Sequence, residues 1–272
     1  MKLYINLNYK TALVFTLYII LLISSQIMCF IPVFEATVKK DNPDIKTDFI
    51  PDLITGDLDS LRPDVKYHYE TIGCPVIKDS AQDTTDLDKS LQSIRKWILS
   101  RSTSNSESMA TQESDYHSIQ YCVFIYGAFG GRFDHEMSAI NHLYQWGEEF
   151  QYNIMLYSEE TCAFLLPSKL NNRICLGLTP FDDEEGEDKN RTENGKLEKD
   201  GKINLLGEGR TCGLIPFGGR CESVTTTGLK WNLDGSIPLE FGGLFSTSNR
   251  IVEQVVTVQS SQPIVFTVEM RS

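Results

Sequence analysis

The fold class is decided by residues 121–131, which read YCVFIYGAFGG. An uninterrupted run of apolar residues, 121–126, is typical of a strand buried on both faces of a parallel sheet. The glycines after it predict a tight loop. Met137, Ile140 and Leu143 then recur at helical spacing and predict a helix directly after the loop. A buried strand, a glycine-rich loop and an amphipathic helix in this order indicate an α/β domain.

The same alternation continues on both sides of this unit. Residues 49–55 (FIPDLIT) and 153–157 (NIMLY) predict two more short strands, and apolar residues at helical spacing predict a helix over 85–99. Strands that alternate with helices favour a parallel sheet. We therefore expect one α/β domain over residues 48–167.

The pattern changes after Pro167. Short β-rich runs separated by Gly, Pro, Ser and Asn follow at 173–178, 212–217, 221–227, 252–258 and 263–268. A chain with many short strands and no long amphipathic helix is typical of a β-sandwich, which we expect over residues 168–272. The strongly acidic stretch at 182–202 is expected to be a disordered surface insertion.

The first 47 residues do not match either pattern. Residues 11–34 carry no charge, and about 20 apolar residues suffice to cross a bilayer. They predict a membrane anchor or secretory signal if this segment is genuine, and an alternative first exon is the competing interpretation. Residues 35–48 are polar and are expected to form a linker. The remainder of the chain favours a cytoplasmic location.

Composition narrows the classes of partner. The net charge of −12 would repel a phosphate backbone, so the chain is not expected to bind nucleic acid. Seven cysteines without a C-x-x-C pair argue against a zinc ribbon or a disulfide framework. Buried free thiols in a reducing compartment are the expectation.

Two acidic clusters follow predicted strands. Asp57 and Asp59 come directly after Gly56, at the carboxyl end of a strand, where ligands bind in open α/β sheets. Their hard oxygens suit Mg²⁺, and a polar turn is the alternative. Asp83 and Asp86 lie at the start of the next helix, where carboxylates normally complement the helix dipole. Two such clusters at successive strand ends favour one shared metal–phosphate site.

Thr84 or Thr85 is expected to cap this helix, with Asp86 and Asp88 in its first turn.

The glycine-rich loop is the third candidate for a functional site. Gly130 and Gly131 permit close approach of the backbone to phosphate, and Arg132 can grip phosphate oxygens. A simple tight turn is the alternative, because the loop matches neither common phosphate-binding motif.

The fourth candidate lies in the β-rich half, in residues 225–233 (TTTGLKWNL) and 246–249 (STSN). An exposed Trp231 can stack on a flat, cationic heteroaromatic ring. The short hydroxyl and amide side chains around it can bind polar atoms of such a ring. A strand tryptophan buried in the core is the alternative.

Together these motifs, in this order, resemble the eukaryotic thiamine pyrophosphokinase family. The matching stretches are GDLDS at 56–60, QDTTDLDK at 82–89, GGRFDH at 130–135, CGLIP at 212–216, TTTGLKWNL and STSN. The resemblance runs from about Phe49 to the C-terminus. It implies a Rossmann-like catalytic domain, then a β-sandwich that binds thiamine, in a homodimer with thiamine between the catalytic domain of one subunit and the β domain of the other.

The resemblance also implies roles for single residues. Asp57, Asp59 and Asp86 would hold Mg²⁺, and Asp57 or Asp86 would accept the proton of the thiamine hydroxyl. Asp83, Arg132 and Asp134, with Gly56, Gly130 and Gly131, would line the nucleotide and pyrophosphate site. Thr227, Trp231, Ser248 and Asn249 would contact thiamine. The implied reaction uses ATP as co-substrate and gives thiamine diphosphate and AMP.

Three positions depart from the family pattern. Ala81 and Ala128 stand where the family usually has Asp and Gly. The family also begins with a strand followed by Ala-Asp-Gly-Gly-Ala-Asn, whereas Gly56 is the first glycine of this chain. We therefore expect one strand to be missing or to be replaced by the apolar segment. Two alternatives stay open: a thiamine-binding or dimerisation module without catalysis, and a membrane-anchored phosphohydrolase that uses Asp57 as nucleophile.

Overall fold

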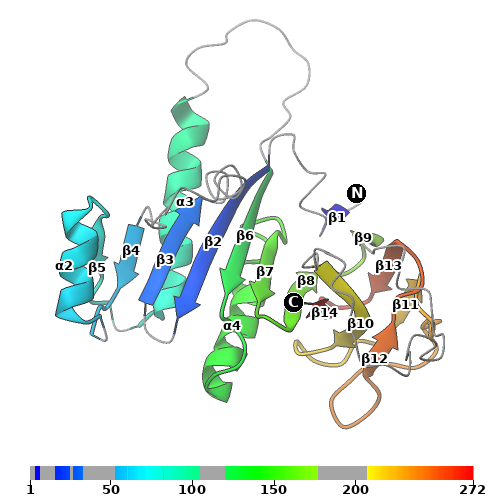
Figure 1. The fold of residues 1–272 in the computed structure, drawn as a ribbon. Helices are drawn as coiled ribbons and strands as arrows, with labels where there is room; N and C mark the ends of the chain where they lie inside the picture. Colours follow the sequence, from blue (N-terminus) through cyan, green and yellow to red (C-terminus); the bar gives the residue numbers. More distant parts are fainter. Residues whose placement is uncertain are drawn as a thin grey trace, which may run out of the picture. The chain divides into compact units, whose positions relative to one another are not determined.

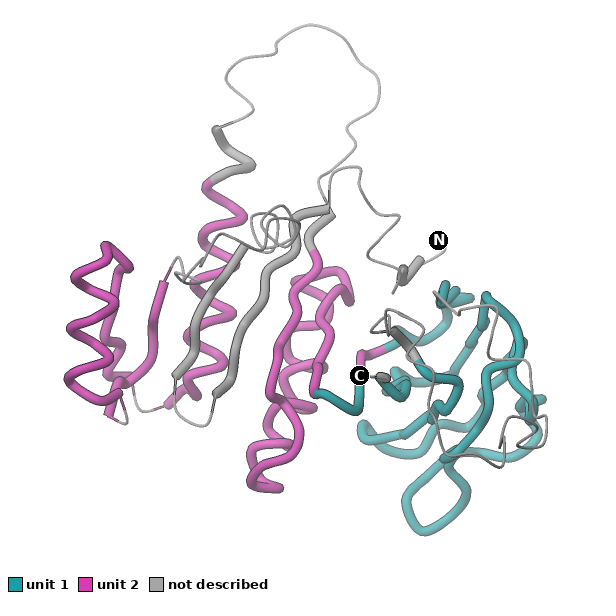
Figure 2. Tube along the Cα trace, in the orientation of Figure 1, with its two compact units in different colours: residues 1–11, 159–162, 166–272 teal, residues 12–158, 163–165 magenta. Residues whose placement is uncertain are grey.

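The computed structural model describes residues 4–6, 16–24, 27–32, 53–59, 61–81, 83–104, 120–176 and 207–271. It divides into two compact units (Figure 2). Unit 1 comprises Met1–Thr11, Glu159–Cys162 and Leu166–Ser272, and unit 2 comprises Ala12–Ser158 and Ala163–Leu165. The expected linker at 35–48 and the acidic insertion at 182–202 lie outside the described residues.

Unit 2 is an α/β domain with strand order β7-β6-β2-β3-β4-β5 (Figure 1). Its strands are β2 (Thr16–Ser24), β3 (Ile27–Pro32), β4 (Leu53–Gly56), β5 (Val76–Lys78), β6 (Gln120–Tyr126) and β7 (Ile154–Tyr157). Its helices are α2 (Pro63–Thr71), α3 (Asp86–Ser104) and α4 (Phe133–Trp146). The predicted alternation of strand and helix is therefore the architecture of this unit.

The sheet of unit 2 is mixed, whereas the sequence predicted a parallel one. β4 and β5, β2 and β6, and β6 and β7 pair in parallel, but β3 runs antiparallel to both β2 and β4. The reason is the short connection between β2 and β3. Two residues can join antiparallel neighbours, while parallel strands need a long crossover.

The apolar segment contributes two strands, β2 and β3, where the sequence led us to expect one strand to be missing or replaced. β2 lies between β6 and β3, with Thr16 to Leu22 in register with Gln120 to Tyr126. The sequence offered a bilayer span or a replaced strand for residues 11–34, and the second is what the structure shows. A strand inside a sheet covered on both faces needs the same uncharged composition as a membrane segment. Within the described ranges, no helix has the length and hydropathy to cross a membrane.

The helices of unit 2 are anchored by buried aliphatic residues. Leu91 and Ile94 of α3 and Leu143 of α4 are almost completely buried, as are Val123 and Ile125 of β6. Burying a side chain of this size contributes about 1.5–3 kcal/mol. The helical spacing in the sequence thus identified the faces that pack on the core, although α3 continues to Ser104, past the predicted end at residue 99.

Helix α2 was not anticipated. It has no buried residues, so its sequence lacks the apolar stripe from which helices are normally recognised. The remaining signals were Pro63 at its first position and Asp64 in its first turn. Such signals mark where a helix begins only once a helix is already suspected.

Unit 1 is the β-rich half. Its strands are β1 (Tyr4–Asn6), β9 (Asn172–Cys175), β10 (Gly207–Ile215), β11 (Val224–Thr227), β12 (Ser246–Arg250), β13 (Val255–Ser260) and β14 (Ile264–Arg271). They form two sheets, whose strand orders are β1-β9-β13-β11 and β12-β10-β14. The neighbour of β14 within its sheet is β8 (Thr161–Leu166), whose residues are divided between the units. Side chains alternate along β13, where Val256 and Val258 are fully buried. This is the predicted all-β domain.

The six cysteines whose side chains the structure describes are free. Burial raises the pKa of Cys122 to about 11 and that of Cys212 to about 12. These two thiols are therefore protonated at neutral pH and have little nucleophilic character. They fit the expected role of small apolar core residues.

Gly228 is predicted to be essential for the stability of unit 1. Its φ is +82°, and a Cβ there would lie 2.6 Å from the carbonyl oxygen of Val255. Gly228→Ala should therefore lower the free energy of unfolding by about 2 kcal/mol or more. The matched control is Gly242→Ala, which has a φ of +84° but open space around the new methyl group, and should cost about 1 kcal/mol. Equal losses in urea unfolding would contradict the steric argument.

Candidate active site

The end of β4 meets the start of α3 at a contact that only glycine permits. The Asp57 N–H donates to Oδ1 of Asp86 over 3.0 Å. Gly56 has a φ of +148°, and a Cβ on it would lie 3.0–3.2 Å from the carboxylate atoms of Asp86. A side chain at Gly56 would therefore be strained at this φ and would require the Asp86 carboxylate, 29 residues away in sequence, to shift by a few tenths of an ångström.

Asp86 is held in the first turn of α3. The N–H of Asp88 donates to the Thr85 hydroxyl over 3.1 Å, so Thr85 is the cap of the two that the sequence allowed. The Lys89 ammonium donates to Asp86 Oδ1 over 3.1 Å, and the Lys89 side chain is only 4% exposed. The sequence analysis missed Lys89. Its position three residues after Asp86 places both side chains on one helix face and could have indicated this ion pair.

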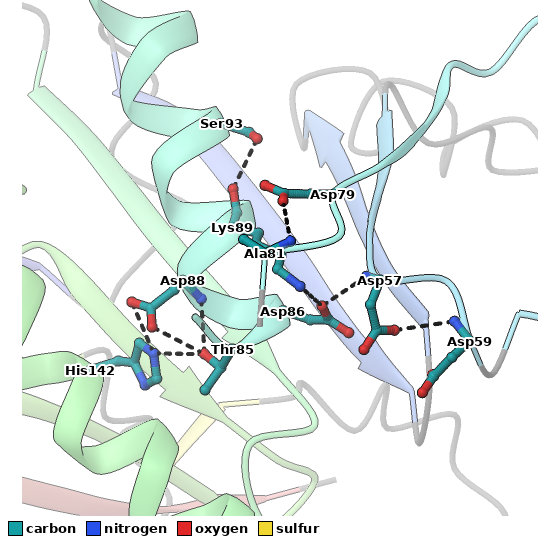
Figure 3. A network of polar contacts seen from close by, with 10 residues as sticks. All are labelled: Asp57, Asp59, Asp79, Ala81, Thr85, Asp86, Asp88, Lys89, Ser93 and His142. Carbon is teal, nitrogen blue, oxygen red and sulfur yellow. Dashed lines mark hydrogen bonds and ion pairs between the residues drawn. The ribbon is translucent and has the colours of Figure 1, made fainter. Parts of the chain in front are cut away.

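The remaining acidic residues of this edge are less closely gathered (Figure 3). The Asp59 N–H donates to Oδ1 of Asp57 over 3.1 Å, which orients the Asp57 carboxylate. Asp83 is exposed. Asp79, which the sequence analysis did not select, follows β5 and donates its N–H to the Gly56 carbonyl over 2.8 Å.

A metal site fits this edge in part. Across the described residues, no group of three or more His, Cys, Asp or Glu side chains is placed to hold a metal ion. Asp57 and Asp86 nevertheless lie together, and Mg²⁺ is commonly held by one or two carboxylates plus phosphate oxygens. The chemistry of this pair therefore suits Mg²⁺, while the third expected ligand, Asp59, is not part of a three-residue cluster.

The glycine-rich loop links β6 to α4, as predicted. The N–H groups of Gly130 and Gly131 point at one acceptor, Oε1 of Glu136, over 2.9 and 3.2 Å. Two neighbouring N–H groups on one oxygen form a small anion-binding nest. The sequence analysis identified the donors but missed Glu136.

Arg132 and Asp134 form a two-pronged ion pair at the start of α4. The Arg132 Nε and Nη2 donate to the two oxygens of Asp134 over 3.1 and 2.5 Å. The hydrogen bond from Arg132 is the main cause that lowers the pKa of Asp134. Both side chains are largely exposed, so this pair is open to exchange with another anion.

A buried histidine joins α3 to α4 (Figure 3). His142 is 2% exposed, and its Nδ1–H donates to the Ser138 carbonyl over 2.5 Å. Its Nε2 lies 3.0 Å from the Thr85 hydroxyl and 3.2 Å from Asp88 Oδ1. The indole N–H of Trp146 also donates to Asp88, over 2.9 Å. These contacts fix the turn that carries Asp86.

In unit 1, Trp231 is displayed by a hydrogen-bonded turn. Its side chain is 56% exposed, which excludes the core alternative, and the Lys230 ammonium lies 5.0 Å from its ring centroid. Asn249 is buried and exchanges two hydrogen bonds with the main chain of Trp231, of 3.3 and 2.9 Å. Asn249 therefore holds the turn that carries Trp231, and its expected contact with thiamine stays a prediction.

Thr227 and Ser248 occupy different positions around this turn. The Thr227 hydroxyl pairs with that of Thr257 over 2.6 Å and is exposed. Ser248 has a φ of 54°, next to an irregularity in the pairing of β10 with β12. Positive φ at a non-glycine residue is a strained conformation that recurs at binding sites.

Comparison with known proteins agrees with both units. A family model described as the thiamin pyrophosphokinase catalytic domain matches residues 24–156, and one described as the thiamin pyrophosphokinase vitamin B1 binding domain matches residues 197–265. Thiamine pyrophosphokinase 1 of Oryza sativa is 35% identical over 88% of this chain and 73% of its own length. Thiamine pyrophosphokinase 1 of Arabidopsis thaliana is 34% identical over 84% and 68%.

Solved structures share the fold. Thiamin pyrophosphokinase from Candida albicans has a TM-score of 0.66 and 24% identity, over 99% of this chain and 93% of that chain. The yeast enzyme has the same TM-score at 20% identity, over 98% and 91%. The architecture is thus an α/β domain with an acidic strand edge, joined to a β-sandwich. The chain belongs to the thiamine pyrophosphokinase family.

The His142 network predicts a pH-dependent loss of stability. Burial acts to raise the pKa of Asp88, but the Trp146 hydrogen bond and the charge of His142 outweigh it, so the pKa falls below the usual 3.8. A lowered pKa means that the carboxylate stabilises the fold above pH 3.8 and loses this effect as the pH falls through its native pKa.

Asp88→Asn should therefore reduce the free energy of unfolding by about 1–3 kcal/mol at pH 7, and by less at pH 3. Urea unfolding at both pH values measures this difference. The control, Asp64→Asn, removes an exposed ion pair with Arg62 and should change little. An equal loss at pH 7 and pH 3 for Asp88→Asn would refute the interpretation.

Proposed function

We propose that this chain transfers the pyrophosphoryl group of ATP to thiamine, giving thiamine diphosphate and AMP. The proposal is supported by membership of the family and by relatives that carry the name thiamine pyrophosphokinase. The observation that carries it is the contact between Asp57 and Asp86. It places two carboxylates at the carboxyl end of a strand, where open α/β sheets bind ligands.

Mg²⁺ is held by Asp57 and Asp86 in this proposal, with Asp59 beside them. The hydrogen bonds from Asp57 and Lys89 both end on Oδ1 of Asp86, so Oδ2 would be the oxygen available to a cation. Lys89 donates to Asp86 Oδ1 over 3.1 Å and holds this carboxylate in place. When bound, the metal ion neutralises charge on the phosphate oxygens.

The polyphosphate of ATP lies along the starts of α3 and α4. The N–H groups of Gly130 and Gly131 bind phosphate oxygens, Arg132 supplies fixed positive charge, and Asp83 and Asp134 line the same region. The hydroxyl oxygen of thiamine attacks the β-phosphorus and AMP leaves. Such a transfer depends on positioning and charge neutralisation more than on covalent help from the protein.

Thiamine is bound by the β-rich domain, over residues 168–272. The exposed face of Trp231 stacks on the cationic ring, with Thr227 and Ser248 at its edge and Asn249 behind the turn. The catalytic domain, over residues 48–167, binds the nucleotide. The chain acts as a homodimer in which thiamine binds between the catalytic domain of one subunit and the β domain of the other.

The direct test is a product assay on the purified chain. With ATP, Mg²⁺ and thiamine, we expect thiamine diphosphate and AMP in equal amounts by liquid chromatography, and no AMP when thiamine is left out. No thiamine diphosphate, or ADP in place of AMP, would refute the proposal.

The roles of the two carboxylates are tested by Asp57→Asn and Asp86→Asn. Each should lower kcat/KM by about 100-fold or more, because each removes one negative charge from the cation site. Asp64→Asn, at an exposed position on α2, is the matched control and should retain activity. Near-normal activity of both site variants would refute the assignment.

A further inference from the structure

The nest formed by the glycine-rich loop is already filled by an anion of the chain itself. Oε1 of Glu136 accepts from both Gly130 and Gly131, over 2.9 and 3.2 Å. Gly130 has a φ of +92°, which turns its N–H toward the same side as that of Gly131. Both hydrogen bonds are exposed to solvent, so the two N–H groups are accessible to a ligand once Glu136 moves away.

The guanidinium of Arg132, next to this loop, is also paired with a carboxylate of the chain itself. Both oxygens of Asp134 are bound to the Arg132 guanidinium. Asp134 and Glu136 belong to the first turn of α4, so one helix turn supplies a carboxylate to each of the two anion-binding groups of this loop. The pairing is thus a feature of the loop and helix together.

A carboxylate and a phosphate compete for such donors. Each backbone N–H has a single proton to donate, and a carboxylate oxygen has the negative charge and acceptor geometry that a phosphate oxygen also offers. A phosphate can take the two N–H groups only after Glu136 has left. The apparent affinity of a ligand falls by the fraction of chains in which its site is vacant.

We propose that Glu136 is an internal competitor for the phosphate groups of the nucleotide, and that ATP binds by displacing it from Gly130 and Gly131. The inference rests on the proposed function, because it takes ATP as the incoming ligand. Displacement lowers the apparent affinity of every anion by the same factor. A polyphosphate, with several charges and further contacts, can overcome it, whereas a single phosphate gains too little.

Two substitutions separate displacement from simple charge repulsion. Glu136→Gln removes the charge but keeps the length of the side chain. Glu136→Asp keeps the charge but is one methylene shorter, so its oxygen no longer reaches both N–H groups at hydrogen-bonding distance. Displacement predicts tighter ATP binding in both variants, whereas through-space repulsion predicts it only in Glu136→Gln. Glu148→Gln, an exposed glutamate just past the C-terminal end of α4, is the charge-matched control.

The measurement is the Kd of ATP with Mg²⁺, by calorimetry without thiamine. We expect Glu136→Gln and Glu136→Asp to bind about three- to tenfold more tightly than the wild-type chain, and Glu148→Gln to bind like it. Hydrogen exchange of the 127–136 segment should be faster in the two Glu136 variants before ATP is added, and equally slow in all chains afterwards.

Unchanged or weaker ATP binding in Glu136→Asp overturns the proposal, because Glu136 then braces the loop or acts only through its charge. The product assay distinguishes this failure from that of the proposed function. If thiamine diphosphate forms and the Kd values of all chains are equal, the proposed function holds and the role of Glu136 as a competitor is refuted. If both variants bind ATP more tightly but no thiamine diphosphate forms, the role of Glu136 holds and the proposed function is refuted.

Discussion

The missing side chain of Gly56 allows the contact on which the site depends. It lets the end of β4 approach the first turn of α3 closely enough for the Asp57 N–H to bond to Asp86. The remainder of unit 2 supports this approach. Thr85 caps the helix, Lys89 binds the same carboxylate oxygen, and the buried His142 ties the turn to α4. The acidic edge is therefore a rigid feature of packed elements, as a site for a metal–nucleotide complex requires.

The free chain satisfies its own phosphate-binding groups. Asp134 neutralises Arg132, and Glu136 fills the nest of Gly130 and Gly131. These groups are exposed, so water could also satisfy them, and the carboxylates of α4 occupy them in place of water. This pairing then sets how strongly a ligand must bind. Trp231 in unit 1 has a comparable partner, since Lys230 lies over its ring where a cationic ligand would stack.

Much of the fold could be predicted from local patterns. Residues 121–126 and 153–157 formed strands where uninterrupted apolar runs indicated them, and the helical spacing after Thr85 formed α3. The antiparallel direction of β3 could not be predicted, because it depends on a two-residue connection inside an apolar segment. Composition alone could not distinguish a bilayer span from strands inside a sheet, since both exclude charge.

The residues of the candidate site likewise include some that the sequence predicted and others that it did not. The rule that ligands bind at strand ends predicts from the sequence that Asp57 and Asp86 lie close together, as they do in the structure. Lys89, Glu136 and His142 were missed because their roles arise from contacts made only after folding. The same limit applies to the bond between the buried amide of Asn249 and the main chain of Trp231, which the sequence did not reveal.

The central claim is that Asp57 and Asp86 together hold the cation that binds the nucleotide. Mn²⁺ substituted for Mg²⁺ reports this by electron paramagnetic resonance in the presence of ATP. The account predicts one bound Mn²⁺ coupled to the phosphorus nuclei of ATP in the wild-type chain, and loss of that signal in Asp57→Asn and in Asp86→Asn at the same concentrations. An unchanged Mn²⁺–phosphorus coupling in both variants would contradict the account.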